Sequence, residues 1–445
     1  MLKALSIITL ALSGWSTCVS AACPSLGSFY PEKLESPDSL PAWEGIRIKL
    51  SEIFGQCLLS SEYFALLGAA QLNSERLPEA IESLERALLL DPDNGAALVD
   101  YADALLQDGQ LFAAIEANAM LLGREDVPNI LLSQISQRQR DWSALTRQTR
   151  WQLDLLGGYD NNLNGAPDED LITLTLSGEP ILLSLSEEFQ AAQGPFLNAR
   201  LVAWHRRLAP NAQHSFQGQV RGRLSEDTAS DVLQVAGRYS RLVGEGSVSR
   251  QWGGGINRLL FSGRPLFTGT DARHRFQFGG AGQCRPYLTG ALQHQIWHEQ
   301  RRLDGAEVKA SFGASCLLAG DAAQRINLEG SALHNAELNA DRLGGDREGW
   351  QILGEWQVAL DRGVISTQIT HTRLLDDRGF SPLLENNARR VVERSSILFQ
   401  YREAIAWLGE NTQLVINLFH QEQNSNIGLF ETEDTSFEVG FRWQF

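Results

Sequence analysis

The sequence predicts a multidomain protein in which an N-terminal all-α unit of helical repeats precedes a C-terminal antiparallel transmembrane β-barrel of about 14 strands. Three observations lead to this fold class. Residues 41–150 are rich in Ala, Leu, Glu and Gln at helical spacing, apolar and polar residues alternate beyond residue 150, and the chain ends on the aromatic-rich "FEVGFRWQF". The net charge of −16 over 445 residues argues against a nucleic-acid-binding protein, which needs a cationic face to neutralise phosphates.

The first 22 residues have the layout of a secretory signal peptide. Lys3 precedes an apolar run over residues 4–15, and the small residues "SAA" follow at 20–22. We therefore expect residues 1–22 to be removed by cleavage near Ala22. One alternative is an ordinary buried N-terminal helix. Another is a lipoprotein acylated on Cys23, although Ser20 stands where a bulky aliphatic residue is expected.

Four cysteines remain once Cys18 leaves with the signal peptide: Cys23, Cys57, Cys284 and Cys316. Four cysteines allow three pairings. The pairing between neighbours in sequence joins Cys23 to Cys57 and Cys284 to Cys316, the second pair at the far ends of an expected hairpin. None of the spacings resembles a zinc site, and free buried thiols are the alternative.

One repeat is visible in the helical part, within "YFALLGAAQLNSERLPEAIESLERALLLDP". Its large and small residues occupy the packing positions of the tetratricopeptide repeat, where small residues let paired helices approach closely and large ones fill the gap between pairs. These residues are Phe64, Leu67, Gly68, Ala80, Leu84, Ala87 and Pro92. A second, degenerate copy follows one repeat length later and carries Asn118 at one of these positions.

We therefore expect residues 23–149 to form a tetratricopeptide-like domain. Helices over residues 43–59 and 127–145 are expected to cap the two repeats. A generic helical bundle is the alternative, because about three repeats are normally needed for independent stability.

Beyond residue 150 the period of the pattern changes to two, as in a β-strand. In "QHSFQGQVRGRL" Phe216, Val220 and Leu224 share one face, and Arg221 and Arg223 lie on the other. The same alternation recurs in the segments 233–240, 325–332 and 350–360. It breaks down around residues 414–420, where Asn417 has apolar neighbours on both sides.

The length of these segments distinguishes a membrane barrel from a soluble β-sandwich. Sandwich strands commonly run about five or six residues, whereas the roughly 9–11 residues that cross a bilayer match the longer segments seen here. Their polar faces carry arginines and glutamines, which a water-filled interior accommodates. Spreading residues 150–445 over 14 strands gives about 21 residues for each strand and its connection, and even strand numbers favour 14, with 12 and 16 as alternatives.

The C-terminus supplies the most specific signal for a barrel. The last eight residues, "EVGFRWQF", read polar, any, Gly, any, any, aromatic, any, aromatic. This pattern resembles the β-signal by which the bacterial barrel assembly machinery recognises its substrates, with Glu438, Gly440, Trp443 and Phe445 at the four specified positions. We therefore expect residues 150–445 to form a barrel in the cell outer membrane of a Gram-negative bacterium, with lipid and the assembly machinery as partners.

No catalytic, cofactor-binding or metal-binding motif fits its context in the sequence. His294 and His298 are four residues apart, but they lack the Glu placement of a zinc-protease helix and lie in an expected strand. The glycines at 253–255 are not followed by a helix, so a phosphate-binding loop is not expected. We therefore expect a protein that is not an enzyme and needs no cofactor, although scattered residues could still assemble a site in a barrel.

The combination of signal peptide, helical repeats and terminal barrel resembles the surface lipoprotein assembly modulator (Slam) family, which joins an N-terminal tetratricopeptide domain to a 14-stranded barrel. The resemblance covers almost the whole mature chain in architecture. At residue level it rests on the junction "GYDNNLNGAP", which follows the first expected strand much as an Asp-Asn-x-Asn motif does in that family. Its residues are Tyr159, Asp160, Asn161, Asn162, Asn164 and Pro167. As an alternative, Asn, Asp and Gly at these positions form an ordinary turn.

Membership of that family would imply an outer-membrane translocator that moves lipoproteins or other secreted proteins from the periplasm to the cell surface. Its repeats would engage the client on the periplasmic side, and its barrel would form the passage. An exopolysaccharide export porin is the alternative, since it also joins periplasmic helical repeats to an outer-membrane barrel. Nucleic acid is not an expected partner.

Overall fold

The computed structural model describes residues 23–30, 40–226, 228–245, 247–279, 282–318, 322–409 and 411–445. The expected signal peptide, residues 1–22, lies outside the described residues. The chain divides into two units, one ending at Leu145 and the other beginning at Thr146. The first strand begins at Arg147, three residues before the expected start of the barrel.

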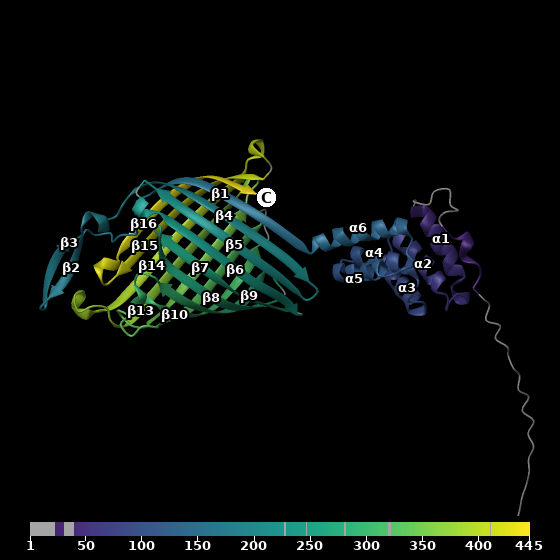
Figure 1. Ribbon diagram of the computed structural model, residues 1–445, viewed down its shortest axis with the longest axis horizontal. Helices are drawn as coiled ribbons and strands as arrows, with labels where there is room; N and C mark the ends of the chain where they lie inside the picture. The colour runs from purple at the N-terminus through teal and green to yellow at the C-terminus, as the bar shows by residue number, and fades with distance from the viewer. Residues whose placement is uncertain are drawn as a thin grey trace, which may run out of the picture. The chain divides into compact units, whose positions relative to one another are not determined.

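The first unit is built from helices, and the second contains a closed antiparallel barrel of 14 strands, so the predicted fold class is confirmed. The helices of the first unit are η1 (Leu26–Ser28), α1 (Leu40–Glu52), η3 (Phe54–Gln56), α2 (Ser61–Asn73), α3 (Leu77–Leu90), α4 (Gly95–Gln107), α5 (Leu111–Leu122) and α6 (Asn129–Leu145) (Figure 1). Along the chain, α2 packs against α3 and α4 packs against α5, which is the pairing that helical repeats require.

The first repeat buries all but one of its expected packing residues. Those buried are Phe64, Leu67, Gly68, Ala80, Leu84 and Ala87. Gly68 of α2 faces α3 so closely that a Cβ there would meet the Leu84 Cγ at 2.5 Å, so a larger residue would push the two helices apart. Pro92 differs, because it is exposed in the turn after α3 and contributes to ending that helix rather than to the core.

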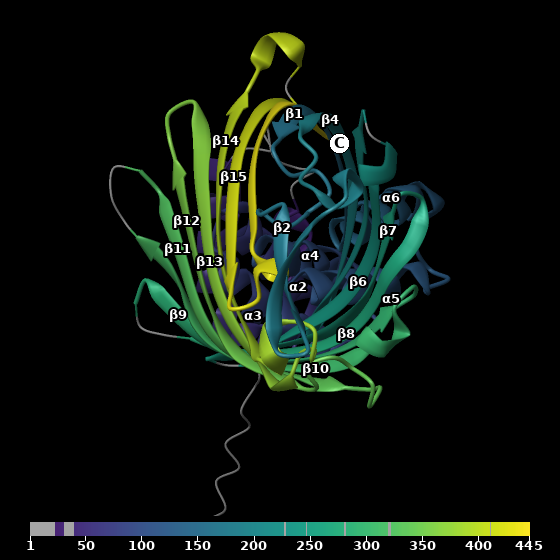
Figure 2. The ribbon, with the colours of Figure 1, turned by 90° about the vertical axis from the view of Figure 1, so that its left-hand side faces the viewer.

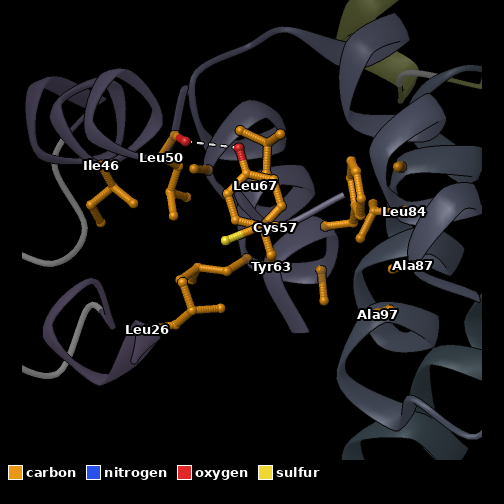
Figure 3. Close-up of a cluster of buried hydrophobic side chains, with 14 residues drawn as sticks. Leu26, Ile46, Leu50, Cys57, Tyr63, Leu67, Leu84, Ala87 and Ala97 are labelled. Atoms are coloured by element: carbon orange, nitrogen blue, oxygen red, sulfur yellow. Dashed lines mark hydrogen bonds between the residues drawn. The ribbon is translucent and has the colours of Figure 1, made fainter. Parts of the chain in front are cut away.

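Polar groups fix where the helices of this unit begin. The side chain of Ser60 accepts a hydrogen bond from the backbone N–H of Tyr63, and Asn94 accepts one from Ala97, so each caps the helix that follows. The Tyr63 ring is fully buried, and its hydroxyl donates to the backbone carbonyl of Leu50 at 2.8 Å (Figure 3). This bond ties α2 to the end of α1.

The expected capping helix over residues 43–59 is too long, because α1 ends at Glu52. The short helix η3 follows, and Cys57 then forms a disulfide with Cys23, which turns the chain before Ser60 caps α2. At the other end, α6 matches the expected helix over 127–145 to within two residues.

Asn118 interrupts the second repeat because it contacts the final helix. It is fully buried in α5, and its side-chain amide donates to the Ile135 carbonyl at 3.1 Å and to Gln139 at 2.6 Å. Its carbonyl oxygen accepts a hydrogen bond from Arg138 Nε at 2.7 Å. The second repeat can therefore have the polar Asn118 at a position that is apolar in the first repeat, because α6 supplies all of its hydrogen-bond partners named here.

The strands of the second unit form a ring in which each barrel strand pairs with its two neighbours (Figure 2). They are β1 (Arg147–Asp160), β4 (Gly194–Ala209), β5 (Ala212–Ser225), β6 (Val232–Glu245), β7 (Val248–Phe261), β8 (Arg264–Phe278), β9 (Cys284–Trp297), β10 (Gly305–Leu318), β11 (Gln324–Glu337), β12 (Arg347–Ala359), β13 (Gly363–Gly379), β14 (Arg389–Ala404), β15 (Thr412–Ser425) and β16 (Thr432–Gln444). Pairing of β1 with β16 closes the ring. A separate hairpin, β2 (Leu171–Leu176) with β3 (Glu179–Ser184), lies between β1 and β4 in the chain.

Apolar side chains point outward from this barrel. Phe216, Val220 and Leu224 of β5 are exposed on one face, as are Phe312 of β10 and Ile369 of β13. The register of the strands from β5 to β13 places all five residues on the same side of the sheet. A continuous band of exposed apolar side chains is what a lipid bilayer solvates, and closure leaves no unpaired strand edge in hydrocarbon. The second unit therefore has the architecture of an outer-membrane barrel.

The two ends of the barrel have different connections. At one end they span residues 210–211, 246–247, 279–283, 319–323, 360–362 and 405–411. At the other end they span 161–193, 226–231, 262–263, 298–304, 338–346, 380–388 and 426–431. The first set forms the short-turn end, where β1 begins, and the second forms the long-loop end. The β2–β3 hairpin extends beyond the long-loop end and overlies the ring of strands in the view from that side (Figures 1 and 2).

Helix α6 is followed directly by β1, so the chain joins the helical unit to the short-turn end of the barrel, where β1 begins. Among the described residues, no helix is long and apolar enough to cross a bilayer. The structure joins Cys284 of β9 to Cys316 of β10 by a disulfide, and these two residues are direct partners in the strand pairing. Both disulfides are the pairings between neighbours in sequence.

Candidate functional site in the barrel interior

Basic side chains outnumber acidic ones on the interior face of the barrel, although the whole chain is acidic. The strand register places the following basic residues on that face: Arg150, Arg200, Arg206, Arg221, Arg223, Arg238, Arg273, Arg275, Arg285, Lys309, Arg325, Arg347, Arg390, Arg394, Arg402 and Arg442. The acidic residues there are Asp154, Asp160, Asp271, Glu307, Glu329, Glu337, Glu355, Asp376, Asp434 and Glu438. The interior is therefore a polar surface with an excess of positive charge.

A buried ion pair bridges the closing seam, the pairing of β1 with β16. Arg442 Nε donates to Asp154 Oδ1 at 2.8 Å, and Arg442 Nη2 donates to Asp154 Oδ2 at 3.0 Å. Gln152 Nε2 donates to the same carboxylate, and all three side chains are buried. A bidentate, fully hydrogen-bonded pair of this kind holds two strands in one register.

This seam is shorter than the pairing on the other side of β1. Pairing with β16 runs from Gln152 to Asp160, whereas pairing with β4 runs from Arg147 to Asp160. The strands also approach closely, since a Cβ at Gly440 would meet the Leu155 carbonyl oxygen at 2.1 Å and one at Gly158 would meet the Phe437 carbonyl oxygen at 2.4 Å. Glycine is required at both positions because the facing backbone leaves no room for a side chain.

Three residues of the expected assembly signal lie on β16, on both of its faces, and Phe445 directly follows the strand. Glu438 points inward, where its carboxylate accepts hydrogen bonds from Asn198 at 2.7 Å and from Asn417 at 2.8 Å. Gly440 lies at the seam, while Trp443 and Phe445 follow the outward face near the short-turn end. Asn417 therefore belongs to the interior, although its apolar neighbours hid this in the sequence.

The junction motif fastens the loop that follows β1. Asn162 accepts a hydrogen bond from the Ala166 N–H at 2.9 Å and donates to the Ala166 carbonyl at 2.9 Å and the Glu433 carbonyl at 3.0 Å. Asn161 accepts from the Thr435 N–H at 2.7 Å, and Asn164 donates to the Gln190 carbonyl at 2.8 Å.

Asp160, the last residue of β1, is buried and forms an ion pair with Arg223 Nη1 at 3.0 Å. Its other carboxylate oxygen accepts from the Asn162 N–H at 2.8 Å. Tyr159 is exposed on the outward face, and Pro167 lies within the loop itself. The motif therefore connects β1, β16 and the loop after β1 through hydrogen bonds. The loop also contains the turn that Asn and Asp favour.

Between these groups the interior encloses a cavity of about 380 Å³. It is lined by Asp154, Asn198, Arg200, Arg221, Asn417, Glu438 and their neighbours. The strands that contribute, β1, β4, β5, β14, β15 and β16, are those on either side of the closing seam. A polar cavity here can hydrogen-bond an extended polar chain or hold water, but its side chains make no nucleophile–base pair.

Three loops at the long-loop end pack together over an apolar cluster. Phe380, Leu384 and Ile427 are buried there, with Leu174 of β2 and Phe430 packed against them. The hairpin is tied to this cluster, because the Thr175 N–H donates to the Leu383 carbonyl at 2.8 Å.

Beneath the cluster, Arg390 lies over the rings of Phe380 and Phe430 and forms an ion pair with the buried Asp376 at 3.1 Å. Arg347 Nε is 3.2 Å from the same carboxylate. The long-loop end is therefore closed in part by packed side chains rather than by loose loops.

The histidines considered for a metal site lie apart. His294 is in β9 on the outward face, and His298 lies beyond the end of β9 with its Nε2 2.8 Å from Thr268 Oγ1. Within the described parts of the chain, no group of three or more His, Cys, Asp or Glu side chains is arranged to hold a metal ion.

One family model matches this chain, and the match lies within the helical unit. The tetratricopeptide repeat family model matches residues 71–135, from α2 into α6. A search of curated proteins finds no match to this chain. The finer resemblance to the Slam family, based on the junction motif, stays a prediction.

Solved structures are similar to one unit or the other. The type III secretion translocator chaperone SycD of Yersinia enterocolitica is 19% identical, covering 26% of this chain and 82% of its own, with a TM-score of 0.24. A bacterial polysaccharide outer membrane secretin is 9% identical, covering 66% of this chain and 98% of its own, with a TM-score of 0.35. A loop-deleted OmpT, an outer membrane protein of Vibrio cholerae, is 7% identical, covering 67% and 100%, with a TM-score of 0.37. These likenesses concern the fold alone.

Proposed function

We propose that the protein is an outer-membrane translocator that moves secreted proteins, surface lipoproteins among them, from the periplasm to the cell surface. The helical repeats bind the client, and the barrel forms the passage. The observation that supports this proposal is the connection of the two units, since the repeats lead directly into β1 at the short-turn end of a barrel with a polar interior. A passive diffusion porin has no need of a repeat unit.

The orientation of the protein follows from its connections. Outer-membrane barrels have short turns on the periplasmic side and longer loops outside. Under this rule the end that carries 210–211, 246–247 and 360–362 faces the periplasm. The helical unit would then meet a client before the client reaches the barrel, and the β2–β3 hairpin would lie on the cell-surface side.

The interior suits an extended polypeptide because it offers both donors and acceptors. A polypeptide in a strand-like form exposes backbone N–H and C=O groups that need partners. Amide side chains such as Gln217, Gln219 and Gln234 can supply both, and they lie on adjacent strands of the interior face. The passage would act by hydrogen bonding and shape rather than by chemistry, so we propose no enzymatic step.

A polysaccharide exporter is the second candidate. The excess of basic side chains in the interior favours it, because an anionic polymer would be attracted by them. The two candidates differ in what the helical repeats bind, since a sugar conduit makes no use of a site for protein segments.

The test is the removal of residues 23–145 behind the native signal peptide, which leaves β1 (Arg147–Asp160) whole. We expect the barrel still to insert, while client proteins disappear from the surface of intact cells, as measured by protease shaving and mass spectrometry. The clients are the surface proteins that are present in cells with the full-length protein and missing from cells without it. Heat-modifiable electrophoretic mobility checks that the shortened protein forms a barrel. An unchanged set of surface proteins after this deletion would show that the repeats have no client-binding role.

A pull-down with residues 23–149 then distinguishes the two candidates. Capture of the proteins that the shaving experiment identified supports protein transport. Recovery of glycans alone would favour the exporter.

A further inference from the structure

Three charged residues follow one another on the interior face of β8, and they are not equally engaged. Asp271 accepts a hydrogen bond from Arg238 Nη2 at 3.0 Å. The Arg275 guanidinium lies over the Tyr287 ring, 3.6 Å from its centroid. Arg273, between them, has no hydrogen-bond or ion-pair partner among the residues that the structure describes, and its side chain is exposed to the interior.

The neighbours of Arg273 on the adjacent strands are too small to cover it. Gly253 of β7 and Ala291 of β9 are its direct partners in the pairing. A Cβ at Gly253 would meet the Tyr239 carbonyl oxygen of β6 at 2.1 Å, so the backbone of the neighbouring strand excludes a side chain at this position. Gly253 and Ala291 therefore place no side chain larger than a methyl group beside the guanidinium.

Arg273, Gly253 and Ala291 line a cavity of about 270 Å³, which we call the β8 cavity. Its charged lining consists of Arg238, Asp271, Arg273, Arg275, Lys309 and Glu329. Both acidic residues already have partners, because Asp271 is bound by Arg238 and Glu329 lies 3.6 Å from Lys309 Nζ and accepts from the Tyr287 hydroxyl at 3.1 Å. Neither Arg273 nor Arg275 forms an ion pair with them, and the lining holds four basic groups against two acidic ones.

We propose that the β8 cavity binds oxyanions, with Arg273 as the binding residue, and that the barrel passes anions in preference to cations. A guanidinium offers two parallel N–H groups that match the oxygens of phosphate, sulfate or carboxylate. A polar interior with uncompensated positive charge concentrates anions and repels cations. The inference goes beyond protein transport and does not depend on it.

The experiment uses the full-length mature protein in planar lipid bilayers. Its reversal potential in a KCl gradient is expected to have the sign of chloride selectivity, and inorganic phosphate is expected to reduce the chloride current. Arg273→Gln should move the reversal potential towards zero and weaken the phosphate effect roughly tenfold, since it removes charge-assisted hydrogen bonds. Arg273→Lys should keep the selectivity but lose most of the phosphate effect, because an ammonium group lacks the planar fork.

Arg258→Gln is the matched control, since Arg258 lies on the outward face of neighbouring β7 and its replacement changes net charge equally. It should behave as the unaltered protein. Heat-modifiable mobility confirms that each variant forms a barrel. Absence of current, cation selectivity, or an Arg273→Gln variant with unaltered selectivity and phosphate effect would each overturn the proposal.

Discussion

The helical unit and the barrel bury opposite kinds of side chain. The helical unit hides Leu84, Ala87 and Tyr63 in its centre, whereas the barrel turns Phe312 and Ile369 outward and encloses arginines and carboxylates. One chain therefore uses its apolar residues as a core in the first unit and as a lipid-facing surface in the second. Burial alone consequently does not indicate which residues stabilise each unit.

The difference extends to how buried polar groups are treated. The helical unit satisfies Asn118 with three partners from one neighbouring helix. In the barrel, full charges are buried at the closing seam, where Asp154 and Arg442 neutralise each other. The second arrangement is the more sensitive to change, because loss of either partner leaves a buried charge.

Breaking the seam ion pair should produce the largest effect. Asp154→Ala leaves Arg442 buried without a carboxylate, which is expected to lower the free energy of unfolding of the barrel by about 3–5 kcal/mol. Denaturant unfolding of the protein in lipid vesicles measures this loss. Arg301→Ala is the control, because Arg301 pairs with Asp304 at 3.2 Å in the connection 298–304, outside the strands, and its side chain is 63% exposed. An exposed pair contributes at most about 1 kcal/mol, so equal losses for the two variants would contradict a buried seam.

The next effect belongs to the core of the helical unit. Leu84 is completely buried between α2 and α3, so Leu84→Ala should destabilise this unit by about 2–5 kcal/mol through lost apolar contact and a cavity. Leu89, on the same helix, is 83% exposed, and Leu89→Ala should change stability little. Circular dichroism at helical wavelengths during denaturation follows this unit in the full chain. Similar effects at both positions would mean that α3 does not face the core as described.

Two adjacent residues of β13 test which face of the barrel meets lipid. Ile369 points outward and is 54% exposed, so Ile369→Arg places a charge in the bilayer at a cost of about 2–4 kcal/mol. Gln368 points inward and faces Glu355 on β12, so Gln368→Arg should be tolerated. Unfolding in lipid vesicles compares the two variants. A larger loss for the Gln368 variant would reverse the assignment of the two faces.

The smallest expected effect is a dependence of the helical unit on pH. Burial raises the pKa of Asp100 to about 6, with Asp103 adding to the rise and Arg138 opposing it. The unfolded chain has a pKa of about 3.9, so the folded unit binds this proton more tightly and loses roughly 1–3 kcal/mol of stability as the pH rises from about 4 through 6. Asp100→Asn should remove that decline, as measured by unfolding at a series of pH values. The exposed Asp108, as Asp108→Asn, should leave the decline in place.

The fold could be predicted because each unit repeats a simple pattern. Helical spacing with small residues at Gly68 and Ala80 predicts paired helices, and alternation over ten or more residues predicts strands that cross a bilayer. The prediction of where α1 ends was wrong, since the disulfide from Cys57 and the cap at Ser60 act through distant and side-chain contacts. Asn417 was ambiguous because Val415 and Phe419 also point inward, so the interior there is not uniformly polar.

The interior site was much harder to predict than the fold. Asp154 and Arg442 are 288 residues apart, and no local spacing relates them. The sequence could have suggested this pair only through strand order, because Asp154 lies on the polar face of the first barrel strand and Arg442 on the polar face of the last. Arg273 could not be predicted as a binding residue either, because its accessibility depends on the small residues Gly253 and Ala291 of two other strands.

Closure of the ring by the last strand also ties assembly to the completeness of the chain. β1 is the first barrel strand to be synthesised, but its partner β16 is the last. A chain shortened before Thr432 would expose the backbone of Gln152–Asp160 as an open edge, and each unpaired amide in hydrocarbon costs several kcal/mol. Glu438 and Gly440 lie on this same strand, so a factor that binds them can engage the chain only after β16 has been synthesised.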